Sequence, residues 1–136
     1  MERQFIPVNV ALLTISDTRT FDNDTSGKVL RERVEAENHK IVAQTIVRDD
    51  KYDIRSILSQ WIADLHIQAI ITTGGTGLTG RDGTPEAVKI LFDKDIEGFG
   101  ELFRQLSYDV IRTSTVQSRA IAGVANGTFI FCLPGS

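Results

Sequence analysis

Cysteine, long apolar runs and blocks of positive charge are scarce or absent in this chain of 136 residues, and each shortage excludes a class of protein. The lone cysteine, Cys132, cannot form an internal disulfide, so a disulfide-stapled fold is excluded. The first ten residues lack the charged and then apolar pattern of a secretion signal, which favours a reducing cytoplasm. No apolar stretch is long enough to cross a bilayer, and the net charge of -3 comes without a Lys/Arg block, so we expect neither a membrane nor a nucleic-acid partner.

What the chain does contain is an alternation of apolar segments that is typical of an α/β domain. Residues 8–15, 41–47 and 69–73 are almost continuously apolar and rich in β-branched side chains, as in strands buried on both faces of a sheet. Strands joined by helices in right-handed crossovers build a parallel sheet. The ligand crevice of such a sheet lies beyond the carboxyl ends of its strands.

Helices are expected between these strands. The first is capped within residues 24–26, by Asp24, Thr25 or Ser26, and runs to about residue 39. Its inner stripe is expected to consist of Val29, Leu30 and Val34. The second is clearer, because its apolar side chains follow the spacing of an amphipathic helix, and they are Ile54, Ile57, Leu58, Trp61, Ile62 and Leu65. Trp61 is therefore expected in the core.

The second half of the chain is less regular. Thr84 before Pro85 suits the start of a helix whose apolar residues are Ala87, Val88, Leu91 and Phe92. Residues 98–100 interrupt it, and a further helix is expected to carry Leu102, Phe103 and Leu106. Asn126-Gly127 between two apolar runs is a strong hairpin signal. We therefore predict one α/β domain over residues 1–136, a three-layer αβα sandwich with a mostly parallel central sheet and a C-terminal β-hairpin.

A glycine-rich stretch directly after the third expected strand is the main functional feature. It comprises Gly74, Gly75, Thr76 and Gly77. A strand that ends in such a turn exposes backbone N–H groups, which favour an oxyanion such as phosphate. Asp82 follows in the same loop, and its carboxylate would repel phosphate unless a cation lay between them. The loop therefore predicts a phosphorylated ligand held together with Mg²⁺.

Other interpretations of this loop must be weighed. Residues 75–80 match the dinucleotide fingerprint G-x-G-x-x-G, but the helix is expected only at Thr84, which disfavours a nicotinamide or flavin enzyme. A phosphate-binding P-loop is excluded, because no Gly-Lys-Ser/Thr sequence occurs. The remaining alternative is that the glycines serve only close packing and that Asp82 is a turn residue.

Motifs spread over nearly the whole chain together resemble one known family. They are Thr14-Ile15-Ser16-Asp17, Asp24-Thr25-Ser26-Gly27, Thr72-Thr73-Gly74-Gly75-Thr76-Gly77, Arg81-Asp82-Gly83-Thr84-Pro85-Glu86-Ala87, Gly98-Phe99-Gly100-Glu101, Ser118-Arg119 and Leu133-Pro134-Gly135-Ser136. In these stretches the chain resembles the MoaB/Mog family of molybdenum cofactor biosynthesis, which binds molybdopterin, and residues 5–7 and 24–27 most resemble its MoaB branch. The resemblance implies a molybdopterin adenylyltransferase, which joins the terminal phosphate of molybdopterin to AMP from ATP, with Mg²⁺, and releases pyrophosphate.

The resemblance also implies roles for individual residues. Asp49 and Asp82 match the two key acids of the family, and both are expected at carboxyl ends of parallel strands. They would ligate the metal rather than shuttle protons, because a phosphate monoester is already mostly a dianion at neutral pH. Without the resemblance, Asp49 would be interpreted as a cap or turn residue beside Asp50. The implied substrate- and phosphate-binding set is Ser16, Asp17, Gly74, Gly75, Thr76, Gly77, Ser107 and Ser118.

Some features depart from the family. Cys132 stands where many adenylylating relatives have asparagine, so a hydrogen-bonding group is lost, and the sequence stops at Ser136, where the family continues through a helix. The MoaB branch is also less securely linked to catalysis. A non-catalytic molybdopterin-binding protein therefore stays an alternative, with a dinucleotide-dependent oxidoreductase behind it. The resemblance further implies a homo-oligomer, a trimer or a hexamer, and a downstream molybdenum-insertion protein as a partner.

Overall fold

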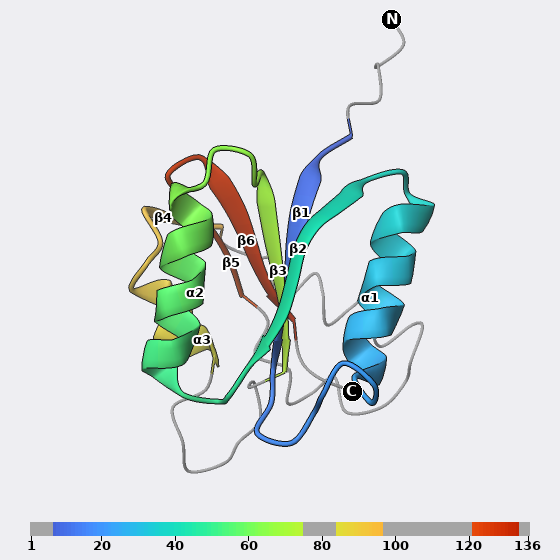
Figure 1. Cartoon of the computed structure of the whole chain (residues 1–136). Helices are drawn as coiled ribbons and strands as arrows, with labels where there is room; N and C mark the ends of the chain where they lie inside the picture. The colour runs from blue at the N-terminus through green and yellow to red at the C-terminus, as the bar shows by residue number, and fades with distance from the viewer. Residues whose placement is uncertain (1–6, 75–83, 97–120, 134–136) are drawn as a thin grey trace, which may run out of the picture.

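The computed structural model describes residues 7–74, 84–96 and 121–133, which form a sheet with helices on both faces (Figure 1). In chain order the elements are β1 (Asn9–Ile15), α1 (Thr25–Ala36), β2 (Lys40–Val47), α2 (Lys51–Ala63), β3 (Ala69–Gly74), α3 (Thr84–Lys89), β4 (Lys94–Asp95), β5 (Ile121–Ala125) and β6 (Thr128–Leu133). The six strands are ordered β2-β1-β3-β6-β5-β4. The first four in this order pair in parallel, and β5 and β4 join antiparallel.

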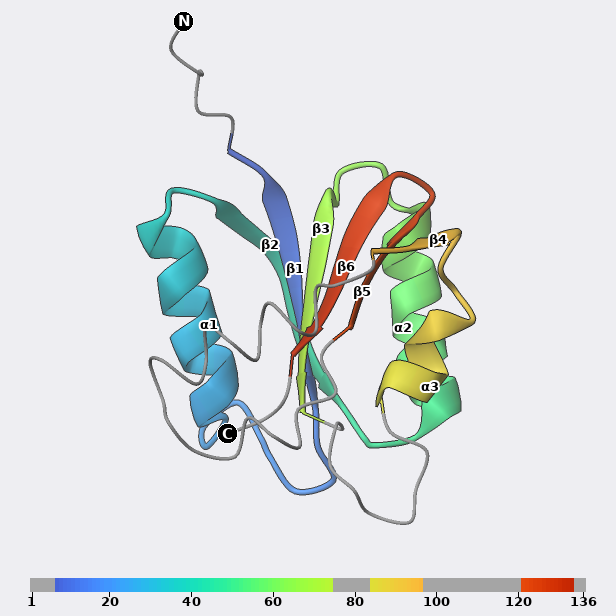
Figure 2. The same cartoon turned by 180° about the vertical axis from the view of Figure 1, so that it is seen from behind.

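Helices lie on both sides of the sheet. Figures 1 and 2 show α1 on one face and α2 with α3 on the other. The predicted αβα layering with a mostly parallel sheet is therefore confirmed. Within the described ranges, no helix has the length and apolar character that crossing a membrane requires.

Strand β1 lies inside the sheet because its side chains are apolar on both faces. Val10, Ala11, Leu12, Leu13 and Ile15 are each at most 3% exposed. Burial of a large aliphatic side chain contributes about 1.5–3 kcal/mol to stability. Well-buried neighbours on both faces therefore hold the carboxyl end of β1 in place, and that end adjoins the candidate site.

Helix α2 follows the predicted spacing except at its end. Ile54 and Leu58 are fully buried, and Trp61 is 8% exposed, so its expected place in the core is confirmed. Leu65 was predicted on the same stripe, but it is 87% exposed. That prediction was wrong because α2 ends at Ala63, so the helical repeat no longer directs Leu65 toward the sheet.

Helix α1 is shorter and less deeply packed than its sequence predicts. Its N-cap is Asp24, one of the expected capping residues, and it ends at Ala36 rather than near residue 39. Val29 was predicted on the inner stripe, but it is 40% exposed. Only Gly27 of this helix is fully buried, which brings the start of the helix, rather than its middle, closest to the sheet.

The second half contains the predicted hairpin and one unpredicted strand. Asn126 and Gly127 join β5 to β6 with φ angles of 51° and 78°, as a tight turn of the Asn-Gly type requires. The two-residue strand β4, which pairs with β5, was not among the predicted strands. A strand of two residues forms because β5 pairs with it, and not because its own residues have a high β-propensity. The expected features at residues 98–106 lie outside the described residues.

Candidate functional site

The carboxyl ends of β1, β2 and β3 meet at one end of the sheet (Figure 1). Ile15 lies in register with Val47 on one side and with Gly74 on the other. The pairing continues one residue further, because the Ser16 N–H donates to the Val47 carbonyl at 2.9 Å. The segments that follow the three strands therefore start side by side, as expected for the ligand end of a parallel sheet.

Two acids from different loops are joined at this end. The backbone N–H of Asp49, after β2, donates to Oδ1 of Asp17, after β1, at 3.1 Å. Asp17 is exposed, whereas Asp49 is half-buried and its Oδ1 atom is buried. Both residues belong to the set that the family resemblance implied, although they are far apart in the sequence. Only the sheet register brings them together.

Asp50, and not Asp49, caps helix α2. Its Oδ1 accepts the N–H groups of Tyr52 at 2.9 Å and Asp53 at 3.0 Å. Arg48 closes the same short loop through an exposed ion pair with Asp53 at 3.0 Å. The capping role that the sequence left open for Asp49 thus belongs to its neighbour.

Gly74 occupies a position that only glycine fits. Its φ angle is +92°, and a Cβ atom added there would overlap the carbonyl oxygen of Ile15. A residue with a side chain is disfavoured by this backbone conformation and by the contact. Close packing against β1 is therefore a role of Gly74 that the structure shows. Gly75, Thr76, Gly77, Asp82, Ser107 and Ser118, which the sequence also assigned to the site, lie outside the described residues.

Ser16 shapes the loop that carries Asp17. Its hydroxyl oxygen accepts the N–H groups of Thr18 at 3.2 Å and Arg19 at 3.1 Å. Such a short-range bond from serine to the backbone is typical of a turn. Ser16 therefore has a structural task in the loop, beside the ligand-binding task expected from the sequence.

A buried polar contact next to this loop was missed by the sequence reasoning. The hydroxyl of Thr14 donates to Oδ2 of Asp24 at 2.6 Å, and Oδ1 of Asp24 accepts the Gly27 N–H at 3.0 Å. Thr14 is 5% exposed and Asp24 is 3% exposed. The available signal was a threonine near the end of an otherwise apolar strand, but its partner could not be read from spacing.

Comparison with known proteins shows to which family the chain belongs. Residues 11–136 match the family described as "Probable molybdopterin binding domain". The chain belongs to the molybdopterin-binding domain family. Molybdenum cofactor biosynthesis protein B of Escherichia coli strain K12 is 51% identical over 133 residues, which cover 98% of this chain and 78% of that protein. The protein of the same name from Staphylococcus aureus strain COL is 48% identical over 132 residues, or 95% of this chain and 78% of the relative.

Solved structures extend the similarity to the fold of this molybdopterin-binding domain. A crystal structure of molybdenum cofactor biosynthesis protein B has a TM-score of 0.90 and 40% identity, covering 98% of this chain and 84% of the other. The tungsten cofactor synthesizing protein MoaB from Pyrococcus furiosus has a TM-score of 0.81 and 37% identity, covering 96% and 83%. These relatives place the chain in the MoaB branch of the family, as its motifs predicted.

The described part of the molybdopterin-binding domain can contribute to a magnesium site but cannot enclose one. Mg²⁺ is usually held by one or two carboxylates together with phosphate oxygens and water. Among residues 7–74, 84–96 and 121–133, no group of three or more His, Cys, Asp or Glu side chains could hold a metal ion. Asp49, the described member of the predicted metal pair, carries a carboxylate at this sheet end beside Asp17. This donor set fits an ion whose coordination is completed by a phosphorylated ligand.

Cys132 lies in the core of the domain rather than on its surface. Its side chain is fully buried in one cluster with Ile70 and Ile130. Burial raises the pKa of its thiol from 9.0 to about 12. The residue that departs from the family pattern therefore packs against apolar neighbours.

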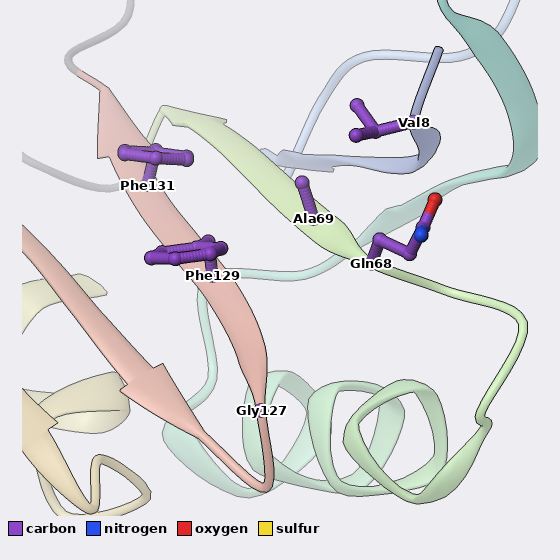
Figure 3. Close-up of a pocket in the computed structure, with 6 residues that line it drawn as sticks. All are labelled: Val8, Gln68, Ala69, Gly127, Phe129 and Phe131. Atoms are coloured by element: carbon purple, nitrogen blue, oxygen red, sulfur yellow. The ribbon is translucent and has the colours of Figure 1, made fainter. Parts of the chain in front are cut away.

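An apolar hollow of about 450 Å³ lies at the other end of the sheet, and its lining consists of Val8, Gln68, Ala69, Gly127, Phe129 and Phe131 (Figure 3). The rings of Phe129 and Phe131 are stacked, with their centroids 6.4 Å apart and an angle of 12° between their planes. The Gln68 side chain forms a hydrogen bond within the protein, because its Oε1 accepts the Asn9 N–H at 2.8 Å. The hollow adjoins the amino ends of β1 and β3, so it is separate from the acidic loops.

Proposed function

We propose that this chain acts in molybdenum cofactor biosynthesis by binding molybdopterin and transferring AMP from ATP to its terminal phosphate. The observation that carries the proposal is the hydrogen bond between the Asp49 N–H and Asp17 Oδ1, at 3.1 Å. It joins the loops after β1 and β2 beside Gly74, where the glycine-rich stretch begins. The named bacterial relatives, which are molybdenum cofactor biosynthesis proteins, support the same pathway.

The transfer needs positioning and charge compensation more than proton transfer. An oxygen of the terminal phosphate of molybdopterin attacks the α-phosphorus of ATP and forms a new P–O bond. The bond from that phosphorus to the oxygen bridging to the β-phosphate breaks, and pyrophosphate leaves with the electron pair. The attacking phosphate is mostly a dianion at neutral pH, so no general base is needed. Bound Mg²⁺ supplies neutralisation of the charge on the phosphates.

The proposed tasks of the chain follow from this chemistry. Asp49 and Asp82 would hold the metal, and the metal would supply charge neutralisation at the triphosphate. Backbone N–H groups of residues 74–77 bind phosphate oxygens, with Ser16, Asp17, Ser107 and Ser118 contacting the substrates. The trimer or hexamer, the transfer to a molybdenum-insertion protein and the cytoplasmic location belong to the same proposal.

The test is incubation of the purified protein with molybdopterin, ATP and Mg²⁺, with detection of adenylylated pterin and pyrophosphate. Asp49→Asn and Asp82→Asn are expected to lower the rate at least about a hundredfold, since even a residue that only supports a metal ligand costs about 10–100-fold. Their melting temperatures should stay close to that of the wild type.

A matched control is available next to the site. Asp50→Asn makes the same chemical change one residue away, and asparagine caps a helix about as well as aspartate. Its rate should stay near that of the wild type. Full activity of Asp49→Asn, or equal losses at positions 49 and 50, would refute the metal-ligand role. Molybdopterin binding without AMP transfer would support the non-catalytic alternative, and saturable NADH binding the oxidoreductase.

A further inference from the structure

The loop between β1 and α1 is closed at its base by two buried side chains. Thr14 precedes the last residue of β1, and Asp24 precedes the first residue of α1. The bond of 2.6 Å between their side chains therefore joins the two ends of residues 16–23. We call this contact the Thr14–Asp24 clasp.

The clasp is tightly built and has little room to adjust. Asp24 is 3% exposed, and one of its oxygens is engaged by Thr14 and the other by the Gly27 N–H. A Cβ atom on Gly27 would overlap Oδ2 of Asp24 and lie 3.0 Å from the Thr14 hydroxyl oxygen. A buried carboxylate depends strongly on its hydrogen bonds, because they replace the water that it has lost. Removal of the Thr14 hydroxyl therefore weakens the anchor of the loop.

Hydrogen bonds connect the base of the loop to the candidate site. Within the loop, Oδ1 of Asn23 accepts the Thr20 N–H at 2.7 Å, and Nη1 of Arg19 donates to the Asn23 carbonyl at 2.8 Å. Asp17 then reaches across to the Asp49 N–H at 3.1 Å. The Thr14–Asp24 clasp therefore closes the base of the loop whose Asp17 side chain contacts the backbone of Asp49.

We propose that Thr14 is a positioning residue of the molybdopterin site. It acts through Asp24, which fixes residues 16–23 and with them the Asp17–Asp49 contact. For its ligand this inference rests on the function proposed above. Thr14 contacts no substrate in this scheme. Its contribution is a loop that is ordered before the ligand binds, so that less conformational entropy is lost on binding.

The test compares Thr14→Val, which keeps the shape and removes the hydroxyl, with Thr14→Ser, which restores a hydroxyl. Thr128→Val is the matched structural control, because Thr128 is 3% exposed and its hydroxyl donates to the Ile67 carbonyl at 3.3 Å at the hairpin end of the sheet. NMR-detected hydrogen exchange is measured at the amides of Thr18, Arg19 and Asp49. The dissociation constant for molybdopterin and the kcat and KM of AMP transfer are measured on the same proteins.

Thr14→Val is expected to speed exchange at the loop amides and at Asp49 about tenfold, which corresponds to about 1.4 kcal/mol. It should also weaken molybdopterin binding about tenfold and raise KM more than it lowers kcat. Thr14→Ser should restore the exchange rates and the dissociation constant to within about twofold of the wild type. Thr128→Val should lower the melting temperature and leave the exchange rates and the dissociation constant unchanged. Equal effects of Thr14→Val and Thr128→Val, or wild-type exchange and binding in Thr14→Val, would overturn the inference.

Failure of the proposed function gives a different result. If the wild type binds molybdopterin but forms no adenylylated product, the transferase proposal fails, while the exchange rates and dissociation constants still decide the role of the clasp. If the wild type transfers AMP and Thr14→Val matches it in every readout, the clasp alone is refuted. If the wild type does not bind molybdopterin, both are overturned.

Discussion

Replacing Gly74 with alanine tests how closely β3 approaches β1 at the candidate site. Gly74 has a φ angle of +92°, and an added Cβ would overlap the carbonyl oxygen of Ile15, which is a backbone atom of the buried central strand. This atom cannot move aside as the end of a flexible side chain can. The strand end must therefore shift if alanine is to fit.

The magnitude has two parts that the structure separates. A residue with a side chain in the left-handed region costs roughly 1–2 kcal/mol. An overpacked contact adds about 1–3 kcal/mol. Gly127 has a φ angle of +78°, and no atom of the described residues other than its chain neighbours lies within 4 Å of an added Cβ. Gly127→Ala therefore carries only the first part. We therefore expect Gly74→Ala to lower the free energy of unfolding by about 2–5 kcal/mol and Gly127→Ala by about 1–2 kcal/mol.

Urea unfolding followed by the fluorescence of Trp61, the single tryptophan, measures both variants. The free energies of unfolding are compared only if the variants and the wild type have the same m-value, because a changed m-value would indicate a change in the unfolded or native state. Equal losses for the two variants would show that Ile15 leaves room for a side chain, and would refute the close approach of β3 to β1.

Further predictions concern the core. Leu58→Ala should lower the free energy of unfolding by about 2–5 kcal/mol, because Leu58 is fully buried. Leu65→Ala should change it by less than about 0.5 kcal/mol, and similar losses in urea unfolding would contradict the exposure of Leu65. The thiol of Cys132 has a pKa raised from 9.0 to about 12 by burial, so its stabilising contribution is complete below pH 9 and is lost as the pH rises from 9 to about 12. Cys132→Ala should show a weaker loss of stability over that range, and rapid alkylation of folded protein at pH 8 would contradict the burial.

Much of the fold could be predicted because its signals are local. Continuous apolar runs indicated the parallel strands, the spacing of Ile54, Leu58 and Trp61 indicated α2, and Asn126-Gly127 indicated the hairpin. The errors at Val29 and Leu65 differ in kind, because Leu65 follows the end of α2, whereas Val29 lies inside α1, of which only Gly27 is fully buried. The short strand β4 lacked a pattern of its own, because its pairing depends on β5.

The candidate site could be predicted only in part. The family motifs pointed to Asp49 and Asp17, and the structure shows that Asp50, rather than Asp49, caps α2. The site role of Asp49 stays a prediction. The close approach of Gly74 to Ile15 depends on the register of neighbouring strands. The members of the site at positions 75–77, 82, 107 and 118 stay predictions.

By itself, the sequence determined the periodicities, caps and turns, and through its motifs the family, because these depend on residues a few positions apart. Only the tertiary structure decided that Asp17 meets Asp49 and that Thr14 holds Asp24. The Asp17–Asp49 contact depends on the register of β1 with β2, and the Thr14–Asp24 contact depends on the packing of the start of α1 against β1. A pattern along the chain specifies which residues must be buried, whereas packing in three dimensions decides which of the remaining polar groups meet.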